Sequence, residues 1–121
     1  MRVLVLAAGL LATSALAQPP ADKWHAEGRA IYQHAIEVPT VAGRGKVPEL
    51  AEWLKAKFAA AGLTDAVIKP YDDSADLIVR WKAEGKPTQK PILLIAHMDV
   101  VEAKAEDWPR DPFKLVEEGG Y

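Results

Sequence analysis

The pattern of apolar and polar positions between residues 22 and 62 predicts two amphipathic helices joined by a short loop. Asp22 stands where a capping residue would begin the first helix, and Pro39 ends its pattern. The apolar stripe of this helix consists of Trp24, Gly28, Ile31, Ala35 and Val38. The second helix is predicted to begin near Lys46 or Val47 and to close at Gly62. Its stripe consists of Val47, Leu50, Ala51, Leu54, Phe58 and Ala61.

Three runs of β-type residues follow the helices and predict a sheet. They are Ala66 to Tyr71, Asp76 to Lys82 and Pro91 to Ala96, and the turn-like Asp72-Asp73-Ser74 favours a hairpin of the first two. The second run alternates only in part, which is typical of an outer strand with one wet face. Ile92 to Ala96 is continuously apolar, which predicts an inner strand covered on both faces. We therefore expect the α/β class, with a mixed sheet, two helices and at least three strands.

The start of the chain differs from the rest. Arg2 provides a positive charge, residues 3–11 are apolar, and Ala15-Leu16-Ala17 places small residues before Gln18, which is typical of a secretory signal peptide. The apolar run is shorter than the roughly 20 residues that cross a bilayer, so a retained membrane anchor is the less favoured interpretation. We predict a signal peptide at 1–17, a spacer at 18–22, and a periplasmic or secreted mature chain without a stable membrane anchor.

Length and composition limit the number of domains and the kinds of partner that we expect. The chain has 121 residues, enough for one domain, and half of them are apolar, as in globular proteins. Its 15 basic and 17 acidic residues give a net charge of -2, so we expect no nucleic acid as a partner. The chain contains no cysteine, so neither a disulfide nor a lipidated cysteine stabilises or anchors it.

The candidate chemistry follows the third predicted strand, at His97-Met98-Asp99. Ligand sites in α/β sheets gather at the carboxyl ends of strands, and side chains two apart on an extended backbone point to the same side. A neutral imidazole is a good zinc ligand, and a carboxylate on its other ring nitrogen orients it. An H-x-D triplet is nevertheless common without its surroundings. A strand-end histidine beside a loop-capping aspartate therefore stays open as the blander interpretation.

A longer stretch carries a family resemblance. Residues 92–101 read I-L-L-I-A-H-M-D-V-V, and Glu106-Asp107-Trp108, Asp111-Pro112-Phe113 and Gly119-Gly120-Tyr121 follow. In order and spacing this stretch resembles the first metal motif of the M20 family of metallopeptidases. That family includes carboxypeptidases, aminoacylases, and acetylornithine and succinyl-diaminopimelate deacylases. The resemblance is close from Pro91 to Tyr121, and the helices and hairpin match the family's opening topology in outline.

The resemblance implies that residues 23–121 are the incomplete N-terminal part of a zinc-peptidase-like α/β/α catalytic domain. His97 would be a ligand of one of two zinc ions, and Asp99 the catalytic-site carboxylate that orients and polarises this histidine. The family's other metal ligands and its general-base glutamate match no position of the chain. A zinc site needs about four ligands, or three and a water, so this chain alone is expected to bind zinc weakly and to be inactive.

The complete protein is accordingly expected to be a zinc-dependent hydrolase of peptide or N-acyl-amino-acid amide bonds that uses a metal-activated water. The alternative is a truncated, non-catalytic exported binding or interaction domain that shares the fold. The resemblance allows a homodimer of the complete enzyme. It leaves open the substrate, because specificity in this family is set by regions that match nothing here.

Other side chains have simpler interpretations. His25 and His34 lie nine residues apart, on different faces of the first helix, and so form no metal pair. Asp72 and Asp73 are expected to form a turn rather than a pair of catalytic carboxylates. An arginine between two glycines, Arg44, is expected to be a solvated loop residue rather than a partner for a substrate carboxylate.

The aromatic side chains are expected to serve packing. Trp108 and Phe113 lie in a loop bracketed by prolines, so we expect them to pin this loop to the domain rather than line a substrate pocket. Trp53 and Trp81 are likewise expected to pack against neighbouring elements.

Overall fold

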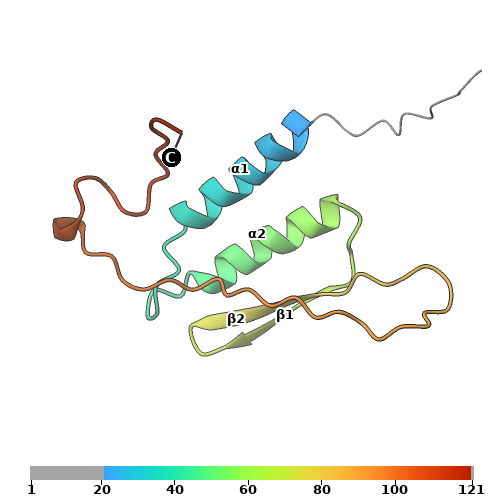
Figure 1. The fold of residues 1–121 in the computed structure, drawn as a ribbon. Coiled ribbons are helices and arrows are strands. Elements are labelled where there is room, and N and C mark those ends of the chain that lie inside the picture. The colour runs from blue at the N-terminus through green and yellow to red at the C-terminus, as the bar shows by residue number, and fades with distance from the viewer. Residues whose placement is uncertain (1–20, 121) are drawn as a thin grey trace, which may run out of the picture.

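The computed structural model describes the backbone of residues 21–120 and the side chains of residues 24–120. The elements are α1 (Ala21–Glu37), α2 (Val47–Ala60), β1 (Ala66–Tyr71), β2 (Ser74–Val79) and a short 3-10 helix, η1 (Ala105–Asp107). Figure 1 shows α2 between α1 and the β1–β2 hairpin, with the later part of the chain running as an irregular segment beside them. The predicted signal peptide lies outside the described residues, and the last two residues of the predicted spacer belong to α1.

The first predicted helix is confirmed as α1, but only part of its apolar face is covered. Trp24, near its beginning, keeps 59% of its surface exposed. Two contacts join α1 to α2: the ring of His34 stacks on Trp53 at a centroid distance of 3.9 Å, and Lys57 Nζ lies 2.9 Å from Glu27 Oε1. The partly buried residues of α1 lie in its second half, from Ile31 onward, and the ion pair of Glu27 joins its first half to α2.

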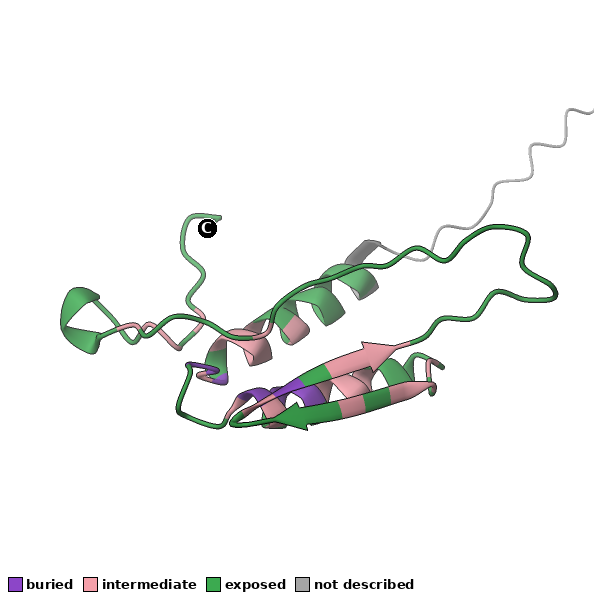
Figure 2. Ribbon diagram, turned by 90° about the horizontal axis from the view of Figure 1, so that it is seen from below, coloured by how far each residue is buried: buried purple, intermediate pink, exposed green. Residues whose placement is uncertain are grey.

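The second predicted helix is confirmed as α2, which carries half of the buried apolar residues of the small core. Val47, Leu50 and Ala51 are buried, and α2 packs against both strands of the hairpin. Figure 2 shows the buried residues gathered at the α1–α2 loop, the first turns of α2 and the adjoining part of β2. The apolar stripe read from the sequence thus covers one face of the sheet.

The end of α2 follows the predicted glycine closure. Gly62 has φ +88°, the left-handed conformation that glycine adopts without strain. The N–H of Leu63 donates to the Phe58 carbonyl at 2.9 Å, and the N–H of Gly62 donates to the Ala59 carbonyl at 3.0 Å. These two bonds form a Schellman motif, which satisfies the last carbonyls of the helix and turns the chain toward β1.

The predicted hairpin is confirmed, with a shift in its second strand. β1 and β2 pair antiparallel from Ala66 opposite Val79 to Tyr71 opposite Ser74. The turn consists of Asp72, with φ +48°, and Asp73, so the predicted turn is confirmed at these two residues. Because the turn is this tight, Ser74 already pairs, and β2 occupies Ser74–Val79 instead of residues 76–82.

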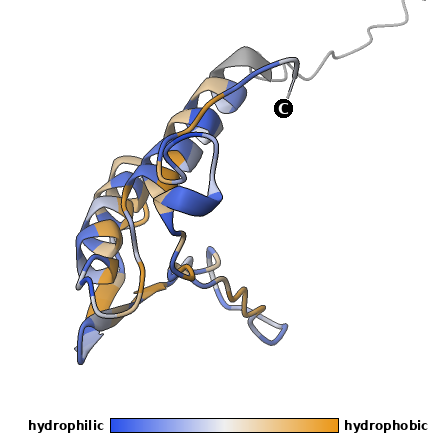
Figure 3. Ribbon diagram, turned by 90° about the vertical axis from the view of Figure 1, so that its left-hand side faces the viewer, coloured by the Kyte–Doolittle hydropathy of each residue, from blue (hydrophilic) through white to orange (hydrophobic). Residues whose placement is uncertain are grey.

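The third predicted strand, residues 91–96, does not form in the described part of the chain. Leu93 is 80% exposed and Leu94 is 89% exposed, and no strand pairs with them. Figure 3 shows this apolar stretch projecting away from the helices. A continuous apolar run indicates burial on both faces, but such a strand requires paired neighbours, and the described sheet has two strands only. The expectation of at least three strands is therefore not met.

The described residues form a small α/β arrangement in which both helices lie on the same side of the hairpin. The three-layer α/β/α domain implied by the resemblance stays a prediction, because the described helices lie on one side of the hairpin only. Within residues 21–120, none of the helices has the length and apolarity needed to cross a membrane.

Candidate functional site

His97 and Asp99 lie in an extended, exposed part of the chain that follows the apolar stretch. Their side chains are 82% and 68% exposed. The sequence expectation that the two residues lie together therefore agrees with their placement, although no strand carries them. Their roles as a zinc ligand and an orienting carboxylate stay predictions.

The ring of His97 is oriented by the residue two positions along. Its Nδ1 lies 2.8 Å from the backbone carbonyl oxygen of Asp99 and 3.5 Å from the Asp99 carboxylate oxygen Oδ1. A carbonyl oxygen accepts only, so this hydrogen bond requires that Nδ1 carries the hydrogen. In the neutral ring, Nε2 then has the lone pair, which is the form that binds a metal through Nε2. We expected the Asp99 carboxylate to be the hydrogen-bond partner of the His97 ring. The backbone carbonyl of Asp99 lies closer to Nδ1 and takes this place.

The described residues supply only part of a zinc coordination sphere. Among residues 24–120, no three or more His, Asp or Glu side chains converge closely enough to hold a metal ion. One imidazole with an adjacent carboxylate fits one corner of a tetrahedral site, which needs about four ligands. A zinc ion at His97 would need further ligands from elsewhere.

The loop between α1 and α2 holds the backbone of this site. Thr40 is fully buried, and its Oγ1 donates to the Met98 carbonyl at 2.6 Å. The N–H of Val100 donates to the Thr40 carbonyl at 3.3 Å, and Val41 forms an isolated parallel bridge with Val100. Sequence reasoning missed Thr40, because nothing in the local pattern indicates that a threonine after a proline contacts residues about sixty positions later.

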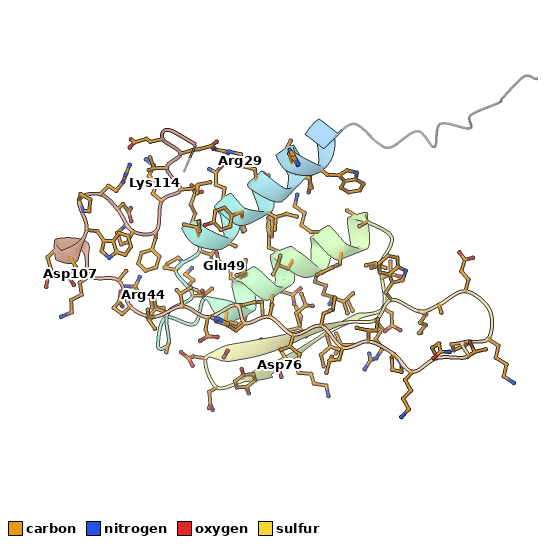
Figure 4. All side chains as sticks on the ribbon, in the orientation of Figure 1. Arg29, Arg44, Glu49, Asp76, Asp107 and Lys114 are labelled. Atoms are coloured by element: carbon orange, nitrogen blue, oxygen red, sulfur yellow. The ribbon has the colours of Figure 1, made fainter. Side chains whose placement is uncertain are left out.

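Arg44 also joins the α1–α2 loop to the segment that follows His97. Its Nη2 donates to both carboxylate oxygens of Glu102, at 2.6 and 2.8 Å, and its guanidinium lies over the Phe113 ring, 5.2 Å from the centroid. Figure 4 shows Arg44 where the α1–α2 loop meets the later segment. Arg44 is therefore an exposed loop residue, as expected from the sequence, and it is also paired with Glu102 of the same chain. Glu102 was also missed, since only the fold brings the two side chains together.

The motif after His97 has its own local structure. Asp111 Oδ1 accepts a hydrogen bond from the Phe113 N–H at 2.9 Å, which is a turn typical of aspartate before proline. Phe113 is half-buried beneath Arg44, as the expected pinning role requires, whereas Trp108 is 52% exposed. The expected packing of Trp81 is wrong, because this side chain is 85% exposed.

The alternatives that the sequence analysis set aside keep their simpler roles. His34 stacks on Trp53, and His25 is exposed. Asp72 forms the hairpin turn, and the Asp73 carboxylate accepts a hydrogen bond from the Gly43 N–H, which joins this turn to the α1–α2 loop. In the described part of the chain, none of these residues belongs to a group of three or more His, Asp or Glu side chains that could hold a metal ion.

A large open hollow of about 1020 Å³ separates the segment around residues 93–101 from α2 and β2. Its walls are mainly apolar, and His97 and Asp99 lie among its lining residues. Because the apolar stretch lies apart from the sheet that it was expected to join, we interpret this hollow as the space between them and not as a formed substrate pocket.

Comparison with known proteins gives a partial match. No family model matches the chain, and no solved structure matches it. The chain is similar to an acetylornithine deacetylase of Dictyostelium discoideum, with 30% identity over 89 residues, which covers 69% of this chain and 20% of the relative. The chain thus spans about a fifth of the length of that relative. The similarity is to a protein named as a deacetylase, which supports a hydrolase in general terms.

Proposed function

We propose that the chain is the N-terminal part of a zinc-dependent hydrolase of the M20 type, which cleaves amide bonds of peptides or N-acyl amino acids. The H-x-D-V-V sequence at residues 97–101 and the similarity to an acetylornithine deacetylase support this proposal. The observation that carries it is the hydrogen bond from His97 Nδ1 to the Asp99 carbonyl, which leaves Nε2 with its lone pair. This is the orientation in which metal-ligating histidines are commonly held.

In this proposal each residue of the pair has a distinct part. His97 would ligate zinc through Nε2, and the Asp99 backbone would hold the ring tautomer. The Asp99 carboxylate, 3.5 Å from Nδ1, would favour a cationic centre. Bound zinc supplies an activated water at neutral pH, and the remaining ligands and the general base would come from regions that this chain does not span.

The proposal includes location and partners. The signal-like residues 1–17 support export to the periplasm or beyond, without a membrane anchor after cleavage. The substrate would be a peptide or an N-acyl amino acid, and nucleic acid is not expected as a partner. A homodimer is compatible with the complete enzyme. Mass spectrometry of the exported protein tests the first point, since a mass that retains residues 1–17 contradicts export with cleavage.

The activity is tested on the complete reading frame that contains this chain. Hydrolysis of a panel of N-acetyl amino acids and dipeptides is measured with zinc present, for the unaltered protein, His97→Ala and His25→Ala. His25 is an exposed histidine on α1 and serves as the matched control. We expect His97→Ala to abolish hydrolysis and His25→Ala to retain it.

Two results would contradict the proposal. Normal turnover by the His97→Ala variant would remove this residue from the metal site. A reading frame without further metal ligands, together with no hydrolysis of any substrate, would favour the alternative of a non-catalytic exported binding domain.

A further inference from the structure

Thr40 makes two hydrogen bonds to the peptide groups on either side of Asp99. The Met98 carbonyl, which accepts from Thr40 Oγ1 at 2.6 Å, belongs to the peptide group before Asp99. The Val100 N–H, which donates to the Thr40 carbonyl at 3.3 Å, belongs to the peptide group after it. Thr40 is fully buried, whereas His97 and Asp99 are exposed, so a buried anchor holds an exposed site.

The second of these peptide groups connects Thr40 to the histidine ring. It contains both the Val100 N–H and the Asp99 carbonyl, and a trans peptide is planar with these two groups pointing in opposite directions. The N–H points to Thr40, so the carbonyl points away from it, and there it accepts the hydrogen bond from His97 Nδ1 at 2.8 Å. The direction of the Asp99 carbonyl is thus set from the Thr40 side.

We propose that Thr40 is a positioning residue, which fixes the tautomer of His97 through the peptide group between Asp99 and Val100. The buried hydroxyl holds the Met98 carbonyl, and this contact keeps the chain at residues 98–100 in register with the α1–α2 loop. A buried hydroxyl that lost this partner would be costly, so the interaction is expected to persist in the folded state. The consequence for metal binding rests on the proposed function, but the tautomer itself does not.

The experiment records the ring ¹⁵N chemical shifts of His97 in the 121-residue chain, at a pH where the imidazole is neutral. The unaltered chain is expected to show Nδ1 protonated and Nε2 unprotonated. Thr40→Val keeps the shape of the side chain and removes the donor, so it should shift His97 to a mixture of tautomers. Thr40→Ser keeps the hydroxyl and should restore the original signal.

Controls separate positioning from general stability. The rings of His25 and His34 provide references in the same spectrum, and neither should change. Leu50→Ala removes buried packing and leaves both hydrogen bonds of Thr40 to residues 98 and 100 in place, so it should destabilise the chain without changing the tautomer of His97 in the folded fraction. A folded Thr40→Val chain with the original His97 tautomer would overturn the proposal.

A measurement on the unaltered chain keeps the test valid if Thr40→Val does not fold. The hydroxyl proton of Thr40 is expected to exchange with water far more slowly than that of Thr88, which is exposed. Equal exchange rates would overturn the proposal. In the complete protein, we expect Thr40→Val to weaken zinc binding by about 10- to 100-fold and Thr40→Ser to restore it. An inactive complete protein with the expected tautomer would defeat the proposed function and leave the role of Thr40 standing.

Discussion

Nη2 of Arg44 donates to both carboxylate oxygens of Glu102, at 2.6 and 2.8 Å, and so joins residues that lie 58 positions apart. The pair connects the α1–α2 loop to the chain that follows His97. Since both side chains are more than a third exposed, water and salt screen much of the attraction.

We expect a coupling of about 0.5 kcal/mol between Arg44 and Glu102, because exposed ion pairs rarely contribute more. The measurement is a double-mutant cycle in urea with Arg44→Ala, Glu102→Ala and the double variant. The coupling should shrink at high salt, and the exchange Arg44→Glu with Glu102→Arg should recover part of it. Coupling that is zero at low salt would mean that the contact contributes nothing to folding.

Shortening a leucine side chain to alanine should affect the free energy of unfolding strongly in the core and weakly in the apolar stretch at residues 91–96. Leu50 is 2% exposed and packs beneath the hairpin, so Leu50→Ala should cost about 2–5 kcal/mol of unfolding free energy or abolish cooperative unfolding. Leu93 is 80% exposed, so Leu93→Ala should change it by less than about 0.5 kcal/mol. Urea denaturation of both variants checks this, and an equal cost would mean that residues 91–96 are buried as the sequence predicts.

Two glycines predict substitution effects of opposite sign. Gly62 has φ +88° at the end of α2, so Gly62→Ala should cost about 1–2 kcal/mol of stability. Gly28 lies inside α1, and an added Cβ meets nothing within 4 Å, so Gly28→Ala should stabilise by about 0.5–1 kcal/mol. Thermal and urea unfolding measure both. Stabilisation by Gly62→Ala would contradict the left-handed closure of the helix.

Asp65 predicts a pH effect at the base of the hairpin. The Lys82 ammonium, with Nζ 2.6 Å from Asp65 Oδ2, holds the pKa of Asp65 below its ordinary value of 3.8. Partial desolvation opposes this shift and Arg80 adds to it. Because the pKa is lower in the folded chain, the stabilisation is present above the ordinary value and is lost as pH falls through the folded pKa.

Replacement of Lys82 tests the cause of this shift. In Lys82→Gln, the pKa of Asp65 should rise toward 3.8, measured by NMR titration of its carboxyl carbon. Lys86→Gln, which changes a lysine of the following loop that forms no ion pair with Asp65, is the matched control. A pKa of Asp65 that is equal in the unaltered chain and in Lys82→Gln would contradict Lys82 as the main cause.

The local pattern of the sequence determined the elements whose contacts are short-range. The two helices, the closure at Gly62, the β1–β2 hairpin and the proximity of His97 and Asp99 all depend on neighbours a few positions apart. Helical periodicity, a glycine that tolerates positive φ and a two-residue turn each act within one local segment. These features could therefore be predicted from the residues alone.

Only the tertiary structure decided how distant segments meet. The contacts of Thr40 with Met98 and Val100, and that of Arg44 with Glu102, join segments about sixty residues apart, and no periodic pattern encodes such pairs. For the same reason, the sequence left undecided whether residues 91–96 form a buried strand. An apolar run specifies that burial is favourable, but the strands that would pair with it determine whether burial occurs.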